Sequence, residues 1–200
     1  MTSSAKSSIM TVALRQPMTL DEFLAWEEQQ ELRYEFDGIG PVAMAGGTAE
    51  HDRISLNLAA SLVVRLRGNP CRPCGSNLKV EVMGRVRYPD GYVTCSPLVP
   101  GTTVTSDPVV IFEVLSRGTA RVDRVEKNRE YRTIASVTHY IMLEQDEIAA
   151  TVLERSGENW ISRLPGPADT LLLPDVGIEI PLVELYEGLD LSSPAADDDS

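Results

Sequence analysis

The feature that most constrains this sequence is an apolar run from Val109 to Ser116 that contains a single acidic residue, Glu113. Read as a β-strand, the run places successive side chains on opposite faces. Both faces are apolar apart from the glutamate, which is typical of a central strand covered on both sides. The face shared with Glu113 holds Val109, Ile111 and Leu115, and the opposite face holds Val110, Phe112 and Val114.

A carboxylate in such a strand is costly to bury unless it is paired, hydrogen-bonded or bound to a metal. Two interpretations of Glu113 are therefore open. In the first, the glutamate is protonated or pairs with an arginine and has a structural role. In the second, it is a metal ligand.

The flanking segments favour the metal ligand. Upstream, residues 85–95 read as a second strand with Asp90 on one face. Downstream, residues 121–135 read as a helix in which a four-residue spacing puts Asp123, Lys127 and Tyr131 on one face. Two carboxylates from adjacent strands suit Mg²⁺, and a nearby ammonium can position a water or stabilise charge on a phosphate.

Several short motifs together resemble the Uma family of putative restriction endonucleases, which belongs to the PD-(D/E)XK nuclease superfamily. The resemblance spans about residues 19–185. The matching motifs are Tyr34-Glu35-x-Asp37-Gly38, His51-x-x-Ile54, Pro89-Asp90, Glu113-Val114-Leu115-Ser116, Asp123-x-x-x-Lys127-x-x-x-Tyr131 and Val137-x-x-Tyr140.

The resemblance implies a metal-dependent DNA endonuclease that hydrolyses phosphodiester bonds as a homodimer. Asp90 and Glu113 would hold Mg²⁺ or Mn²⁺, and Lys127 would orient the nucleophile or stabilise charge on the phosphate. His51 would touch a phosphate or assist proton transfer, or it would simply line the start of a helix. Glu35 would be a further acidic ligand or a paired carboxylate at the edge of the core.

The sequence departs from the pattern at three places. Leu115 stands where the superfamily usually has its lysine, so Lys127 is the expected replacement. Gly91 follows the Pro-Asp pair in place of an aliphatic residue, and glycine weakens a strand interior. Glu144-Gln145 stands where the family often has an aspartate. The alternative function is a catalytically inactive nucleic-acid-binding or regulatory protein that retains the nuclease fold.

Length and composition predict one compact domain at residues 19–190, since 42% of the 200 residues are hydrophobic. Residues 1–18 are expected to be a flexible leader, and 191–200 an acidic disordered tail. The first residues lack the apolar segment of a signal peptide, and no run is long enough to span a membrane. We therefore expect a cytoplasmic protein that does not bind membranes.

The three cysteines agree with that compartment. Cys71 and Cys74 have the spacing of a zinc or redox pair, but a structural zinc site needs four ligands and the sequence has no second pair. We expect this segment to be a loop, because Gly68, Pro70 and Pro73 favour turns.

The net charge of −12 resides entirely in the last quarter of the chain. Residues 144–200 contain two Arg and fourteen acidic residues, whereas residues 51–143 contain thirteen basic and eight acidic ones. A patch of this kind can contact phosphates, although several of its arginines are expected to pair with glutamates on a solvated helix face. The basic residues that follow Glu113 are Arg117, Arg121, Arg124, Lys127, Arg129 and Arg132.

The order of elements predicts an α/β (α+β) fold, a restriction-endonuclease-like mixed sheet flanked by helices, with an N-terminal helix and hairpin. Strand, helix and strand across residues 109–144 indicate one parallel crossover. Helices are expected at 20–30, 49–66, 121–135 and 181–186, and a loop at 97–107. Strands are expected at 33–37, 42–45, 77–83, 86–95, 109–116, 138–144, 148–154 and 159–164.

Overall fold

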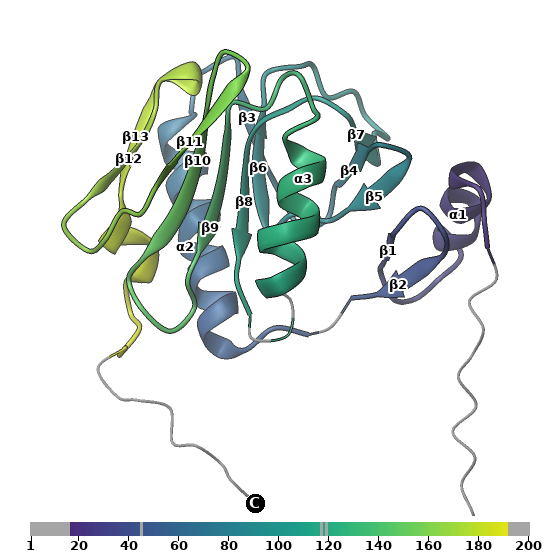
Figure 1. Cartoon of the computed structure of the whole chain (residues 1–200), viewed down its shortest axis with the longest axis horizontal. Coiled ribbons are helices and arrows are strands. Elements are labelled where there is room, and N and C mark those ends of the chain that lie inside the picture. The colour runs from purple at the N-terminus through teal and green to yellow at the C-terminus, as the bar shows by residue number, and fades with distance from the viewer. Residues whose placement is uncertain (1–16, 45, 117, 119, 192–200) are drawn as a thin grey trace, which may run out of the picture. The chain divides into compact units, whose positions relative to one another are not determined.

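The computed structural model describes residues 17–44, 46–116, 118 and 120–191 (Figure 1). The expected leader and acidic tail lie almost entirely outside these residues. The chain divides into two compact units, one up to Met44 and the other from Ala45 onward. No helix in the described ranges is long and apolar enough to cross a bilayer.

The N-terminal unit consists of one helix and one hairpin. Helix α1 (Leu20–Glu27) begins at Thr19, whose hydroxyl accepts from the Glu22 backbone N–H. The Glu22 carboxylate in turn accepts from the Thr19 backbone N–H, as the capping-box spacing predicts. The antiparallel strands β1 (Tyr34–Phe36) and β2 (Pro41–Ala43) form the expected hairpin. Phe23 stacks on Phe36 with ring centroids 4.9 Å apart, which gives this unit its small core.

The larger unit is built on a six-stranded sheet in the order β11-β10-β9-β8-β6-β3. Strands β8 and β9 are parallel, and every other pair is antiparallel. The predicted parallel crossover is therefore confirmed. The bounds are β3 Arg72–Gly75, β6 Gly91–Thr94, β8 Pro108–Val114, β9 His139–Leu143, β10 Ala150–Ser156 and β11 Asn159–Arg163.

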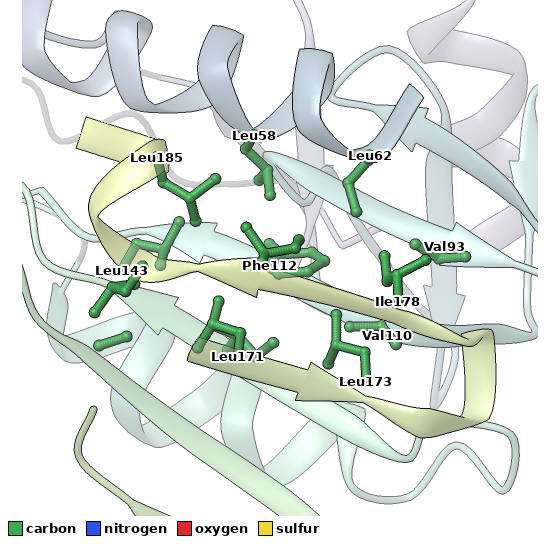
Figure 2. Close-up of a cluster of buried hydrophobic side chains, with 14 of the residues drawn as sticks. Leu58, Leu62, Val93, Val110, Phe112, Leu143, Leu171, Leu173, Ile178 and Leu185 are labelled. Carbon is green, nitrogen blue, oxygen red and sulfur yellow. The ribbon is translucent and has the colours of Figure 1, made fainter. Parts of the chain in front are cut away.

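Both faces of this sheet are covered, as the two apolar faces of β8 predict. Helix α2 (Ala49–Arg65) and a C-terminal hairpin pack on one face, where Phe112 meets Leu58 and Leu185 in a common core (Figure 2). A π-helical segment (Val122–Lys127), which continues directly into α3 (Asn128–Tyr131), lies on the other face. In Figure 1 α3 stands in front of the sheet and α2 behind it.

The C-terminal hairpin was not predicted. Strands β12 (Thr170–Leu173) and β13 (Ile178–Pro181) pair antiparallel around a short 3₁₀ turn (Pro174–Val176). Gly177 follows that turn at φ 68°, a conformation that favours glycine. The expected terminal helix is a 3₁₀ helix, Leu182–Tyr186. The hairpin buries alternate residues, namely Leu171, Leu173, Ile178 and Ile180.

The strand predicted at 86–95 is wrong as one element. It divides into β5 (Arg85–Arg87), which pairs with β4 (Lys79–Val82), and β6, which joins the large sheet. Pro89 lies between the two, and a proline supplies no ladder donor. Asp90 therefore sits at the junction, just before β6. A two-residue strand, β7 (Val104–Thr105), pairs with β4 inside the segment expected to be a loop.

The loop expected around the first two cysteines is also wrong. Residues Arg72–Gly75 form the edge strand β3, whose register with β6 pairs Arg72 with Thr94. One position further along, Cys71 and Cys95 face each other and form a disulfide, while Cys74 is a free, partly buried thiol. The disulfide links neighbouring strands, a long-range relation that the local spacing of Cys71 and Cys74 does not contain.

Two arginines of β5 fix α3 against the rest of the unit. The buried carboxylate of Glu130 accepts bonds from Arg87 Nε at 2.7 Å, Arg87 Nη2 at 2.8 Å and Arg85 Nη1 at 2.6 Å. Forked contacts of this kind are geometrically specific and strong. Both arginines precede Glu113; among the basic residues that follow it, Arg124 pairs with a glutamate, Glu144.

The close approach of α2 to the sheet at Gly91 leaves no room for a side chain there. A Cβ at this position would stand 3.1 Å from Leu58 Cδ2 on α2, whereas one at Gly75, the cross-strand partner of Gly91, meets nothing within 4 Å. We predict that Gly91→Ala lowers the free energy of unfolding by about 1–3 kcal/mol through overpacking. Gly75→Ala should change it by less than about 0.5 kcal/mol. Urea denaturation of both variants measures the difference, and equal effects would contradict the packing argument.

Candidate active site

Glu113 is buried, with 3% of its surface exposed, and it faces α3 rather than α2. Its Oε1 accepts hydrogen bonds from Lys127 Nζ at 3.0 Å and from the Tyr131 hydroxyl at 3.0 Å. A lysine and a tyrosine therefore partner the glutamate, where the structural interpretation expected an arginine. Both partners come from the helical segment that follows the strand.

Lys127 lies between two carboxylates. Its ammonium is also 3.0 Å from Asp123 Oδ1, and all three side chains are buried. The contact with Asp123 is an ion pair without the alignment of a hydrogen bond. The segment thus presents Asp123, Lys127 and Tyr131 to the sheet, as their four-residue spacing predicts, although the first turn is π-helical.

Two buried tyrosines, Tyr131 and Tyr140, pack beside Asp123 and Lys127. The Tyr140 hydroxyl donates to the Asp123 carbonyl at 3.0 Å, and the Tyr140 and Tyr131 rings meet edge to face with centroids 5.1 Å apart. Both rings are fully buried. Since Tyr140 belongs to β9, the contact fixes the π-helical turn against the strand parallel to β8.

Asp90 contacts strand β8 from the side of β6, opposite to β9. The antiparallel register pairs Gly91 with Phe112, so Asp90, just before β6, lies opposite Glu113 of β8 in the continuation of that register. Asp90 Oδ2 accepts the backbone N–H of Val114 at 2.7 Å. Within the described residues, Oδ1 of Asp90 makes no hydrogen bond.

His51 contacts Asp90 from α2. Thr48 caps this helix, which places His51 in its first turn with Nε2 3.3 Å from Asp90 Oδ2. The hydrogen bond with Asp90 raises the pKa of His51 against the opposing effect of burial, and the charges of Asp90, Asp123 and Asp52 add to the rise. The neighbouring carboxylates therefore favour the protonated form of His51.

The remaining sequence candidates lie elsewhere. Glu35 is on β1 of the N-terminal unit, and its role stays a prediction. Leu115, at the place of the superfamily lysine, is buried in the apolar cluster beneath α3. The Lys127 ammonium thus contacts Glu113 from the helix, as proposed from the sequence. The Val114 N–H was missed, because a backbone donor leaves no signal in the sequence.

The donor set fits a small hard cation. Asp90 and Glu113 supply carboxylate oxygens from neighbouring strands, and Mg²⁺ binds through one or two carboxylates while it keeps several waters. Among the described residues, no three His, Cys, Asp or Glu side chains form a ready-made metal cage. A cation here would therefore rely on the two carboxylates and water, and it would compete with Lys127 for Glu113.

The two histidines of the chain give a pH test of this geometry. Burial lowers the pKa of His139, whereas the bond with Asp90 raises that of His51. In an NMR titration we expect His51 to titrate above about pH 6.5 and His139 below it. Asp90→Asn should lower the pKa of His51 and leave that of His139 unchanged. If His51 does not respond to Asp90→Asn, the contact is absent in solution.

The same contact contributes stability in a defined pH range. Because the pKa of His51 is raised on folding, its contribution is fully present below about pH 6.5 and is lost as the pH rises through the folded value. The difference in unfolding free energy between the wild type and His51→Gln should therefore be larger at pH 6 than at pH 9. Urea denaturation at the two pH values measures it.

Comparison with known proteins places the chain in a family. The family described as "Uma2: Putative restriction endonuclease" matches residues 20–182. The chain is 28% identical over 173 residues to the uncharacterized protein slr1290 of Synechocystis, covering 84% of this chain and 91% of that protein, and 29% identical over 144 residues to sll1609 of the same organism, covering 68% and 80%.

A solved structure shares the fold. The crystal structure of a putative nuclease belonging to DUF820 from Anabaena variabilis superimposes with a TM-score of 0.68 at 17% identity, covering 85% of this chain and 98% of that one. At that identity the likeness shows the fold alone. With the family match over most of its length, the chain belongs to the Uma2 family of restriction-endonuclease-like proteins.

Proposed function

We propose that this protein is a metal-dependent DNA endonuclease. The observation that supports this most is the placement of Asp90, just before β6, opposite Glu113 of the adjacent strand β8, with the Lys127 ammonium 3.0 Å from Glu113. This arrangement supplies two hard ligands and one cation at the same end of the sheet. The family to which the chain belongs is described by the same class of activity.

Asp90 and Glu113 would hold Mg²⁺ or Mn²⁺, which when bound supplies an activated water and a Lewis acid for the leaving oxygen. Lys127 would donate to a non-bridging oxygen of the scissile phosphate, where negative charge develops. The attacking water would form a bond to phosphorus and release a proton to solvent, while the ester bond to the leaving oxygen breaks and that oxygen takes up a proton from solvent water. His51 would keep a proton at Nε2 directed at Asp90 Oδ2, which fixes that carboxylate.

A homodimer in the cytoplasm is part of this proposal, since two copies would present two sites to the two strands of one duplex. The Cys71–Cys95 disulfide runs against that compartment, since disulfides are rare in the reducing cytosol. The second candidate function is a catalytically inactive nucleic-acid-binding or regulatory protein. The observation that favours it is the pairing of the Lys127 ammonium with both Glu113 and Asp123. A metal ion could bind Glu113 only if it displaced this ammonium.

Calorimetric titration with MgCl₂ or MnCl₂ separates the two functions. We expect divalent binding in the wild type, and its loss in Asp90→Asn and in Glu113→Gln. Glu126→Gln is the matched control, because Glu126 is an exposed carboxylate on the same helical segment. Unchanged binding in Glu113→Gln, or the absence of binding in the wild type, would favour the inactive protein.

Replacement of Lys127 tests its role between the carboxylates. Lys127→Met removes the shared cation and leaves Glu113 and Asp123 buried without it, so we expect a loss of about 3–5 kcal/mol of stability without metal. A divalent cation should then raise the melting temperature of Lys127→Met more than that of the wild type. DNA cleavage should fall far more than DNA binding, because the ammonium acts on the transition state. Cleavage at the wild-type rate would remove Lys127 from the mechanism.

A further inference from the structure

The outer side of α3 contains a hollow that the candidate active site does not use. It measures about 520 Å³ and lies between α3 and strands β10 and β11. Four arginines line it, together with one tryptophan and a single carboxylate. These residues are Arg124, Arg129, Arg132, Arg155, Trp160 and Glu158. We call this hollow the arginine groove.

The floor of the arginine groove is fixed. Arg155 Nε donates to the Val137 carbonyl at 2.7 Å, and its Nη2 donates to the Ile134 and Arg132 carbonyls at 2.8 and 3.0 Å. The same guanidinium lies 4.5 Å from the centre of the Trp160 ring. Arg155 thus joins the end of α3 to β10 and holds Trp160 in place, which makes a rigid base with a positive charge.

Two arginines on the sides of the arginine groove have no carboxylate partner among the described residues. Arg129 and Arg132 are exposed, and neither pairs with a carboxylate within the described ranges. The Arg132 guanidinium lies 5.4 Å from the centre of the Trp160 ring. The ring is neutral, so it does not cancel the positive charge of Arg132. Arg124 does have an acidic partner, Glu144, at 2.5 Å. In a chain with a net charge of −12, this local excess of guanidinium groups points to an anionic ligand.

The groove adjoins the candidate active site on the same helical segment. Arg124 follows Asp123, which pairs with Lys127, and Arg132 follows Tyr131, which donates to Glu113. The two stripes are therefore neighbours around a helix only about 10–12 Å wide with its side chains.

We propose that the arginine groove binds the phosphates of a DNA strand and positions that strand beside the candidate active site. The inference rests on the proposed function and adds the surface that holds the substrate. The guanidinium fork matches phosphate oxygens, and arginines interleaved with an aromatic ring are typical of surfaces that follow a nucleic-acid strand. Arg129 and Arg132 supply the phosphate contacts, and Trp160 supplies an aromatic surface at the base of the groove.

The first test compares two charge-matched double variants. DNA binding is measured by fluorescence anisotropy with a labelled duplex in EDTA, over a range of salt concentrations. We expect Arg129→Gln with Arg132→Gln to weaken binding by about tenfold or more at low salt and to reduce the salt dependence by about two phosphate contacts. Arg67→Gln with Arg72→Gln is the control, since both are exposed arginines outside the groove. Equal affinities and equal salt slopes for the two double variants would overturn the proposal.

The second test reports on the groove directly. The chain has two tryptophans, so Trp26→Phe leaves Trp160 as its single tryptophan. Addition of an oligothymidylate should change the emission of Trp160, and Arg129→Gln with Arg132→Gln should abolish the change. No change with DNA, or an equal response to polyglutamate, would show that the groove does not select nucleic acid.

Both tests exclude divalent metal, and each should give the same result in Glu113→Gln, which keeps the groove intact. The groove proposal therefore fails on DNA affinity alone, whereas the proposed nuclease function fails on metal binding or cleavage. A protein that binds DNA through the groove but binds no metal would retain this inference and lose the endonuclease.

Discussion

The contact of one buried ammonium with two buried carboxylates is the constraint on which the rest of this site depends. Lys127 lies 3.0 Å from both Glu113 and Asp123, so it joins the central strand β8 to the helical segment packed on it. Breaking such a pair by removing one partner is strongly destabilising, because a buried charge is left uncompensated. The three charged side chains on the inward face of this helix must therefore stay together, and the apolar residues beneath α3 pack around them.

The same constraint sets the chemistry that the site can perform. Without a metal, Lys127 compensates Glu113, while Asp90 is held by the Val114 N–H and by His51. Each carboxylate thus has a fixed orientation before any ligand arrives, and such preorganisation is what electrostatic catalysis requires. A divalent cation would take over part of the role of Lys127 and leave the ammonium free to face a phosphate. Gly91 contributes by allowing Leu58 of α2 to approach the sheet beside Asp90.

Sequence reasoning reached the parts of this structure that short-range patterns encode. The two apolar faces of β8 and the stripe of Asp123, Lys127 and Tyr131 follow from periods of two and of about four residues, and the start of α1 follows from its capping-box spacing. The N-terminal hairpin and the parallel crossover also follow from local patterns. The position of Lys127 against Glu113 was anticipated from the family resemblance, because Leu115 stands where the superfamily usually has its lysine.

The features that were missed depend on contacts between distant segments. The break at Pro89 moves β5 and β6 into different pairings, although both halves have strand-like sequences. The Cys71–Cys95 disulfide exists because β3 and β6 are adjacent. The His51–Asp90 contact joins the first turn of α2 to a strand junction 39 positions further along the chain. Likewise, the arginine groove combines α3 with Arg155 and Trp160 of a later hairpin.

The most direct measurement is an anomalous difference map from crystals soaked in MnCl₂. The account predicts one peak between the carboxylates of Asp90 and Glu113, at a coordination distance of about 2 Å from an oxygen of each. It also predicts that the Lys127 ammonium moves away from Glu113 while it keeps its contact with Asp123. A map without a peak there, with Lys127 still on Glu113, would contradict the metal-dependent account and leave this cluster as a structural ion pair.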